Sequence, residues 1–250
     1  MTIGSVTAAR SLAFGAVADG VWGVAWLPSA ESTGPVVLGA AGGAGVVDAS
    51  VEARGPEDAW RIVGAETDLS LAPASAASSH RADGGLAGLD QLCRAEGRFA
   101  FGGREHRVSC LGWRATVEPP TGRDRSASLR QTAAWFEPGA GMSLLALRPG
   151  SARGHDDDLV SAAVIDQDGP IEVSDPRLST TYGEGGLPRR AGLELWVGDE
   201  EEQYPRRAAG EPVGEPAAWT ADGLDLRAQL FRWHSSGQDG AGMYLLGTLP

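Results

Sequence analysis

A hairpin-like motif occurs twice in this chain, and it constrains the fold more than any other feature. The first copy lies within residues 129–149 (LRQTAAWFEPGAGMSLLALRP), where two apolar runs flank a Glu-Pro-Gly turn. Its segment GAGMSLL at 139–145 returns as GAGMYLL at 240–246, and Trp135 before the first copy corresponds to Trp233 before the second. Self-similarity over such a distance indicates a β architecture built from related halves.

Turn-forming residues are spread along the whole chain of 250 residues. The 36 glycines and 15 prolines separate short apolar runs, at the spacing of about 8–12 residues that is typical of sandwiches and barrels. Gly102-Gly103, between the alternating runs 91–101 and 104–113, is a strong hairpin signal. The sequence therefore predicts an all-β fold in which two antiparallel barrel or sandwich halves pack together.

The boundary between the halves is expected in the Pro/Gly-rich segment 115–127. This segment would link an N-terminal half, residues 1–114, to a C-terminal half, residues 128–250. The apolar run 11–18 is short and broken by glycine, so we interpret it as an N-terminal strand of a cytoplasmic protein and not as a signal peptide.

Four segments carry weaker signals. Residues 73–85 (PASAASSHRADGG) predict a polar loop in which His80 is solvated. Residues 86–92 are the one candidate for a turn or two of helix. Residues 175–190 are predicted to be irregular, and residues 203–216 are rich in proline.

Charge and composition exclude several classes of function. The chain has a formal charge of −12 at pH 7 and contains no lysine. Schiff-base catalysis by lysine and a phosphate-binding-loop lysine are therefore excluded. No basic stripe indicates nucleic-acid binding, and no run approaches the roughly 20 apolar residues that a membrane-spanning helix needs. We expect no cofactor and no metal.

Cys93 and Cys110 are the only cysteines, and they do not form a CxxC motif. Zinc-ribbon and thioredoxin interpretations are therefore excluded. Two buried, reduced thiols are expected. The alternative is one disulfide between neighbouring strands.

The expected layout resembles that of a known family. The hairpin 96–113 (EGRFAFGGREHRVSCLGW) is followed by the segment 123–126 (RDRS). This arrangement resembles the lipocalin-like proteins related to hydroxyneurosporene synthase (carotenoid 1,2-hydratase) and the AttH group, in which a glycine-containing strand leads into Arg-Asp-x-Ser-Trp-Gly. Here the Trp-Gly part is missing, because Ala127-Ser128 follow, and the chain is shorter than the hydratases.

The resemblance implies two lipocalin-like barrel halves packed side by side. Members of this group with known activities protonate or cyclise apolar substrates, by hydration of a terminal alkene or by pericyclic ring closure in polyketides. Other members have no assigned activity. The resemblance therefore supports the fold more than a particular reaction.

The densest polar cluster is the segment 153–158 (RGHDDD), on a loop that enters a strand. Loops held by a rigid scaffold often carry function. A His beside three carboxylates could bind a divalent metal, or one Asp could be kept protonated by like-charge crowding. His155, Asp157 and Asp158 are candidate catalytic residues on the second basis. Consecutive strand residues point to opposite faces, so at most two of the acids converge. The alternative is a solvated turn whose Asp side chains accept backbone N–H bonds.

A sharper candidate acid is Glu194, which shares one face of a strand with Trp196. The other face carries Leu193, Leu195 and Val197. If both faces are covered, Glu194 lies beside an aromatic ring in a pocket, where burial raises its pKa and makes it a general acid. If that face is solvated, Glu194 is an ordinary surface carboxylate.

Six further residues are candidates for binding substrate. Arg177 could orient a carboxylate or enolate through its planar fork, with Tyr182 nearby in the same irregular stretch; the alternative for Arg177 is an ion pair with one of the many acids. Four of the eight tryptophans are predicted on strands as pocket walls, where aromatic faces stabilise cations, although most are expected in the core. They are Trp113, Trp135, Trp196 and Trp233.

These candidate residues are compatible with three functions. The first is an enzyme that binds a hydrophobic small molecule of isoprenoid or polyketide type and catalyses acid-assisted cyclisation, hydration or isomerisation. The second is a non-catalytic carrier of a hydrophobic ligand, which predicts an apolar cavity without a buried carboxylate. The third is a glycosidase, which needs two acids about 5–10 Å apart across a cleft.

Overall fold

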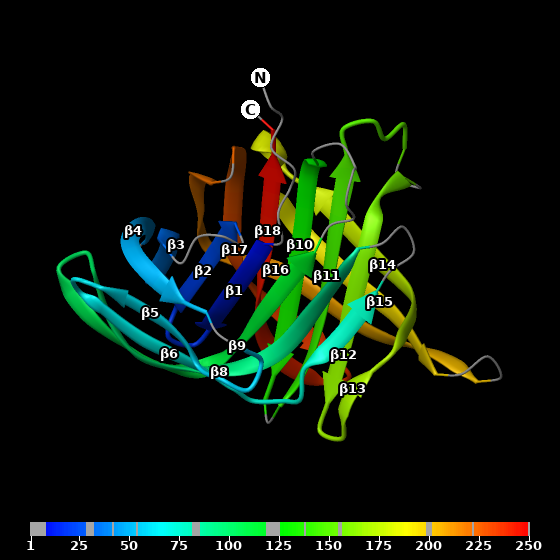
Figure 1. Ribbon diagram of the computed structural model, residues 1–250, viewed down its shortest axis with the longest axis horizontal. Coiled ribbons are helices and arrows are strands. Elements are labelled where there is room, and N and C mark those ends of the chain that lie inside the picture. The colour runs from blue at the N-terminus through cyan, green and yellow to red at the C-terminus, as the bar shows by residue number, and fades with distance from the viewer. Residues whose placement is uncertain are drawn as a thin grey trace.

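The computed structural model describes residues 9–28, 33–41, 43–53, 55–81, 86–118, 126–137, 139–154, 157–198, 202–221 and 223–249. Regular structure in these residues consists of strands, apart from short 3-10 segments such as the turn at Glu184–Gly186. The strands form two antiparallel sheets, each curled into a barrel (Figure 1). The predicted all-β fold with two barrel halves is confirmed.

The first sheet closes on itself. Its strands are β1 (Ala9–Ala16), β2 (Val21–Pro28), β3 (Thr33–Ala40), β4 (Gly43–Glu52), β5 (Trp60–Gly64), β6 (Thr67–Pro73), β7 (Ser78–Arg81), β8 (Ala87–Phe101) and β9 (Arg104–Glu118). Pairing of β6 with the outer part of β8 completes the barrel. The short β7 pairs with the other end of β8 and extends beyond the closed barrel as an edge.

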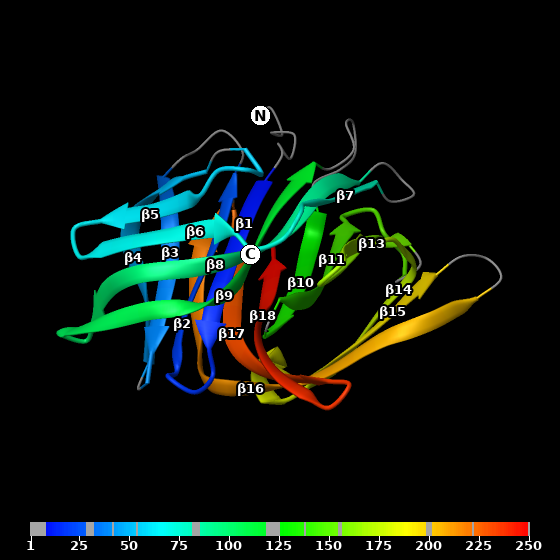
Figure 2. The same cartoon turned by 90° about the horizontal axis from the view of Figure 1, so that it is seen from below.

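The second sheet is nearly closed. Its strands are β10 (Ser126–Phe136), β11 (Ala140–Pro149), β12 (Leu159–Asp166), β13 (Gly169–Ile171), β14 (Val173–Tyr182), β15 (Pro188–Gly198), β16 (Gln203–Ala221), β17 (Leu224–Ser235) and β18 (Gln238–Thr248). β13 and β14 are the two edges, and they approach each other without forming a ladder among the described residues. Figure 2 shows β3–β6 at one end of the molecule, β13–β15 at the other, and β1, β10 and β18 in the middle.

Three apolar clusters stabilise the molecule: one inside each barrel, and one between the barrels. Strands in the middle are therefore buried on both faces. In β11, Met142 and Leu144 face the interior of the second barrel, whereas Leu145 and Leu147 face the core between the barrels. This double burial explains why the sequence there is a continuous apolar run without polar alternation.

Both copies of the repeated motif lie in the second sheet, in the hairpins β10–β11 and β17–β18. The repeat therefore relates two hairpins of one barrel rather than the two halves of the molecule. Equivalent residues of the two copies face opposite sides of the sheet. Met142 lies inside the second barrel, whereas Met243 lies between the barrels. An apolar motif can serve in both settings because each hairpin is buried on both faces.

The Gly102-Gly103 hairpin is confirmed. Both glycines have positive φ, 59° and 74°, which a two-residue turn of this type requires, and Phe101 pairs directly with Arg104. The predicted helical turn at 86–92 is wrong. From Ala87 onward the chain is β8, with Leu92 in the core between the barrels and Cys93 inside the first barrel.

Two segments expected to be irregular or proline-rich are strands. β14 covers most of the first half of 175–190, and β16 is a 19-residue strand that includes 203–216. Pro216 falls in a register irregularity between Val213 and Ala217, where Gly214 has a φ of 74°. Pro205 and Pro212 lie within the ladders that β16 forms with β15 and β17. Residues 115–118 of the expected linker belong to β9.

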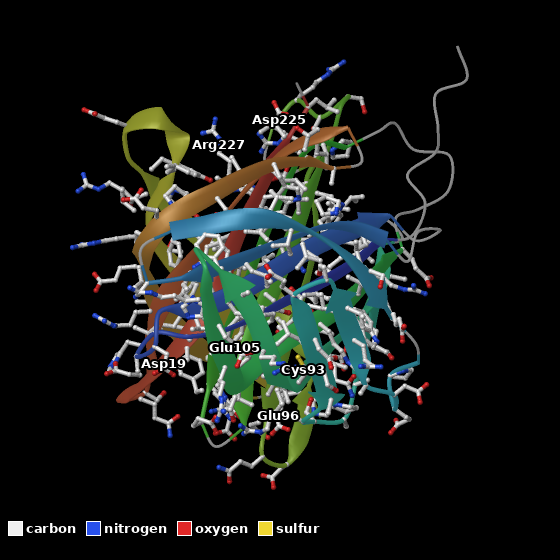
Figure 3. The ribbon with its side chains drawn as sticks, turned by 90° about the vertical axis from the view of Figure 1, so that its left-hand side faces the viewer. Asp19, Cys93, Glu96, Glu105, Asp225 and Arg227 are labelled. Atoms are coloured by element: carbon white, nitrogen blue, oxygen red, sulfur yellow. The ribbon has the colours of Figure 1, made fainter. Side chains whose placement is uncertain are left out.

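Cys93 and Cys110 are free and buried, and burial raises the pKa of each thiol to about 12. Figure 3 shows Cys93 within the barrel and Glu96, on the same strand, at its periphery. The N-terminal strand is confirmed as β1, which pairs with β2 and β9. Among the described residues there is no helix long and apolar enough to cross a membrane.

The contact between the barrels can be tested at Trp135. Its ring is buried in the inter-barrel core, and its Nε1 donates to the carbonyl oxygen of Gly15, 3.0 Å away in the other barrel. Trp135→Phe should lower the free energy of unfolding by about 1–3 kcal/mol, measured by chemical denaturation, because a buried carbonyl loses its donor. Trp196→Phe, on the outer surface of the second barrel, should change it by less than about 0.5 kcal/mol. Equal losses of unfolding free energy in Trp135→Phe and Trp196→Phe would contradict a stabilising contact between the barrels at Trp135.

Candidate functional site

A cleft of about 830 Å³ lies where β7 of the first barrel meets β12–β14 of the second. Its wall mixes polar and apolar side chains, and it is lined by Ala77, Ser78, Ser79, His80, Asp158, Val160, Ser161, Ala162, Pro170, Ile171, Glu172, Val173, Ser174 and Pro176. Val160, Ala162, Ile171 and Val173 also pack against the core of the second barrel. The cleft therefore follows the unclosed seam between β12–β13 and β14.

His80 of β7 forms part of the cleft wall and stands in front of a buried carboxylate. Its Nδ1 lies 3.2 Å from Oδ2 of Asp90, and the side chains of His80 and Asp90 are only 13% and 8% exposed. The two groups do not form a hydrogen bond, so the contact is electrostatic.

Asp90 of β8 joins the two barrels. Its Oδ1 accepts hydrogen bonds from Trp113 Nε1 at 2.5 Å and from Ser143 Oγ at 2.9 Å. Trp113 lies on β9 of the first barrel and Ser143 on β11 of the second. The carboxyl group is therefore held from both sides of the inter-barrel core.

The surroundings of Asp90 shift its protonation. Burial raises the pKa of the Asp90 carboxyl, and this effect exceeds the opposing effects of His80, Trp113 and Ser143. A carboxyl group with a raised pKa, coupled to a histidine at a cleft, is suited to general acid and base chemistry.

The local sequence explains how His80 reaches Asp90. His80 pairs with Gly88 across the β7–β8 ladder. A Cβ atom at position 88 would lie 2.8 Å from Nε2 of His80 and 2.4 Å from the carbonyl oxygen of Thr116. Glycine is therefore required here for the imidazole to lie over β8.

The prediction that His80 is solvated in a loop is wrong, because it belongs to β7 and is largely covered. The strand Ser78–Arg81 has no apolar periodicity that could have revealed it. A signal did exist at Asp90. It stands beside Gln91 in the segment 89–93 (LDQLC), whose other residues are apolar, and a charged residue in a buried strand requires a partner.

Asp158 lies at another part of the cleft wall and is bound by two guanidinium groups. Its Oδ1 accepts from Arg148 Nε at 2.7 Å, and its Oδ2 accepts from Arg130 Nη2 at 2.6 Å. The Asp158 side chain is 3% exposed. Both oxygens are thus engaged, so its role in this arrangement is to hold two arginines.

The other members of the predicted acidic cluster lie elsewhere. Asp157 is exposed, and its Oδ2 accepts a hydrogen bond from the backbone N–H of Arg153 at 2.7 Å, as a turn residue does. His155 and Asp156 lie outside the described residues.

Glu194 lies on the outer face of the second barrel with its side chain 30% exposed. It accepts hydrogen bonds from Arg207 Nε at 2.7 Å and from Trp196 Nε1 at 3.1 Å. These bonds lower the pKa of Glu194, and the positive charge of Arg177 acts in the same direction. Of the two alternatives for Glu194, the solvated face is the one observed, and a raised pKa is not.

Arg177 and Glu194 border a second groove, of about 560 Å³, on the outer face of β14–β17. The guanidinium of Arg177 also lies 5.8 Å from the Trp196 ring centroid. Tyr182 is at the rim of the second barrel and is 44% exposed.

The remaining tryptophans are structural or lie beside Asp90. Trp135 is in the inter-barrel core and Trp233 is inside the second barrel. Trp113 bonds to Asp90. The predicted site residues are therefore spread over several places, and among those described only Trp113 and Asp158 adjoin the His80–Asp90 site.

No protein-family model matches the chain, and no curated protein matches it in sequence. Several solved structures do match. An AttH-type protein from Nitrosomonas europaea superposes with a TM-score of 0.65 at 12% identity, over 97% of this chain and 92% of that one. CghA superposes with a TM-score of 0.65 at 12% identity, over 98% and 89% of the two chains. Kievitone hydratase from Nectria haematococca gives 0.61 at 8% identity, over 97% and 88%.

The chain shares the fold of these proteins. This confirms the fold-level resemblance that the sequence indicated. CghA has also been solved with Sch210972, and that structure superposes with a TM-score of 0.61.

The raised pKa of Asp90 predicts a pH dependence of stability. Because the folded-state pKa lies above the unfolded value, the stability that Asp90 contributes is present at low pH and is lost as the pH rises through the folded-state pKa. Asp90→Asn removes this loss, so the variant should gain stability relative to the wild type as the pH rises above about 4, the pKa of an ordinary aspartate, measured by urea denaturation.

Ser143→Ala serves as the control for this experiment. It removes one hydrogen bond to the same carboxyl group but keeps the titrating residue. The stability of Ser143→Ala should therefore still fall with rising pH, as the stability of the wild type does. A stability difference between Asp90→Asn and wild type that is independent of pH would contradict the raised pKa.

Proposed function

We propose that the protein is an enzyme that protonates an unsaturated small molecule in the cleft, in a hydration, cyclisation or isomerisation. The observation that carries this proposal is the buried Asp90 carboxyl group behind His80, at the wall of a cleft of about 830 Å³. The proton donor is the His80–Asp90 pair. The fold shared with CghA and with kievitone hydratase supports a reaction of this class.

The cleft wall indicates the kind of substrate. Val160, Ala162, Ile171 and Val173 offer apolar contact along the seam, whereas Ser78, Ser79 and Ser161 offer hydroxyl groups. None of the described tryptophans is part of this wall. A substrate that combines an apolar skeleton with oxygen functions, as in a polyketide, fits better than a pure hydrocarbon.

The proposed step conserves atoms and charge. The His80–Asp90 pair gives a proton to one carbon of a carbon–carbon double bond, and a cation forms at the neighbouring carbon. In a hydration, water attacks that carbon and returns a proton to the pair. In a cyclisation, a nucleophilic group of the same substrate attacks instead and loses its proton to the pair. Either route restores the donor for the next turnover.

A non-catalytic carrier is the alternative function. A carrier has no need for a buried acid beside its ligand, and the buried polar network at Asp90 costs desolvation energy. The presence of Asp90 and Ser143 behind His80, which lines the cleft, therefore favours catalysis.

The test uses kievitone as the substrate and Sch210972 as a binding probe, because these molecules are named for proteins of the same fold. Wild-type protein should add water to kievitone, detected by mass spectrometry. His80→Gln and Asp90→Asn should slow turnover by about 10²–10⁴-fold, the usual contribution of a positioned acid, while Sch210972 still binds by calorimetry.

Two controls accompany these variants. His234→Gln changes a histidine of the outer groove and should leave turnover unchanged. Ser79→Trp fills the cleft from its exposed edge and should abolish binding of Sch210972. Turnover that survives both His80→Gln and Asp90→Asn would eliminate the proposed proton donor, and binding that survives Ser79→Trp would eliminate the cleft.

A further inference from the structure

The chain changes register between β6 and β7, where it leaves the closed first barrel. Both strands pair with β8, but the β6 ladder ends with Pro73 opposite Cys93, whereas the β7 ladder begins with Ser78 opposite Asp90. The four residues 74–77 therefore face only two residues of β8. This is a bulge of two residues, and bulges beside functional sites often re-aim a side chain.

The bulge determines where His80 lies relative to Asp90. If the β6 ladder continued without interruption, His80 would be opposite Leu86. The bulge moves it along β8 by two residues, about 7 Å, so that His80 pairs with Gly88. From that position the imidazole reaches Asp90, its diagonal neighbour, with Nδ1 3.2 Å from a carboxyl oxygen. The His80–Asp90 contact therefore depends on the bulge.

Side chains hold the bulge in place of a regular ladder. Gln91 Nε2 donates to the carbonyl oxygen of Ser75 at 2.8 Å, and Ser75 Oγ accepts from the backbone N–H of Leu92 at 3.2 Å. The backbone N–H of Ala74 donates to the carbonyl oxygen of Leu92 at 2.9 Å. Gln91 is only 1% exposed, so its amide is shielded from water and depends on protein partners.

Arg114 fixes the orientation of that amide. It lies directly opposite Gln91 on β9, is fully buried, and donates from Nε to Gln91 Oε1 at 2.8 Å. A guanidinium group has donors only, so the amide must turn its oxygen to Arg114 and its NH₂ group to Ser75. Arg114 also donates to the carbonyl oxygens of Pro56 and Asp58, which hold the guanidinium in one position.

The second barrel contains the same arrangement. The pairing of β16 with β17 shifts by two residues between Val213 and Ala217, opposite Gln229. Gln229 is 8% exposed, and its Nε2 donates to the carbonyl oxygen of Gly214 at 2.6 Å. In both barrels a buried glutamine thus supplies a donor to a bulge carbonyl that the interrupted ladder leaves without one. Gln229 is not part of the described cleft wall.

We propose that Gln91 is a positioning residue for the proton donor: held by Arg114, it fixes the bulge at 74–77 and so keeps His80 in contact with Asp90. This rests on the proposed function, since it concerns the same His80–Asp90 pair. Gln91 projects from the face of β8 opposite to that of Asp90 and is not part of the described cleft wall. It therefore acts through the register of β7 and not by touching the substrate.

Gln91→Glu separates the two contacts of this side chain. A carboxylate still accepts from Arg114 but cannot donate to the Ser75 carbonyl, so β7 should slip and the NMR cross-strand nuclear Overhauser contacts between His80 and Gly88 should be lost. Gln91→Leu removes both contacts and should have the same effect. Gln229→Glu is the matched control, because it loses an equivalent buried hydrogen bond and should keep the His80–Gly88 contacts.

The coupling between His80 and Asp90 gives a second readout that a loss of stability alone would not change. In the wild type and in Gln229→Glu, adding His80→Gln should shift the ¹³C signal of the Asp90 carboxyl carbon. In Gln91→Glu it should not, because the two groups are already apart. Turnover of kievitone should fall about 10–100-fold in Gln91→Glu, the usual cost of a misplaced catalytic group, and stay unchanged in Gln229→Glu.

The outcomes separate the two proposals. His80–Gly88 contacts and an Asp90 response that survive both Gln91→Glu and Gln91→Leu would overturn the positioning role, whatever the turnover. Loss of both signals in these variants, with a wild-type protein that does not hydrate kievitone, would support the positioning role and count against the proposed function alone.

Discussion

The apolar core between the two barrels is the contact on which the rest of this structure depends. It joins the outer faces of β1, β2 and β9 to those of β10, β12 and β18, so neither barrel has a solvated outer surface on that side. Polar groups inside it cross from one barrel to the other: Gln131 donates to Ser11 Oγ at 2.8 Å, and Ser143 donates to Asp90 at 2.9 Å. Apolar contact supplies the stabilisation, and these few directional bonds specify one alignment of the barrels.

The same constraint creates the candidate site. A carboxyl group between two barrels is removed from water on both sides, and its pKa rises as a consequence. The seam of the second barrel remains open just where β7 leaves the closed first barrel, and a cleft forms there. His80 is the side chain that connects the buried acid to that cleft. Fold and chemistry are therefore coupled, because a displacement of one barrel would separate Asp90 from Ser143.

Much of the fold followed from local sequence, and little of the site did. Gly102-Gly103 predicted its hairpin because two-residue turns demand positive φ, which is a local property. The repeat predicts related halves although both copies lie in one sheet, because sequence similarity specifies neither the barrel nor the buried face, and Met142 and Met243 face different cores. The position of His80 cannot be predicted from its own segment, because β7 gains its position from pairing with β8. Alternation alone favours Glu194 as an acid, because it cannot reveal that Arg207 pairs with this carboxylate across a ladder.

The most direct test of the central claim is a ¹³C NMR titration of the aspartate side-chain carboxyl carbons, with the Asp90 signal assigned by its loss in Asp90→Asn. The account predicts that the Asp90 carboxyl titrates at a higher pH than an ordinary aspartate, whose pKa is near 3.9. It also predicts that the signal responds to His80→Gln, since the two groups are in contact. An Asp90 signal that titrates near the ordinary value, with no response to His80→Gln, would contradict the existence of a buried acid at this cleft.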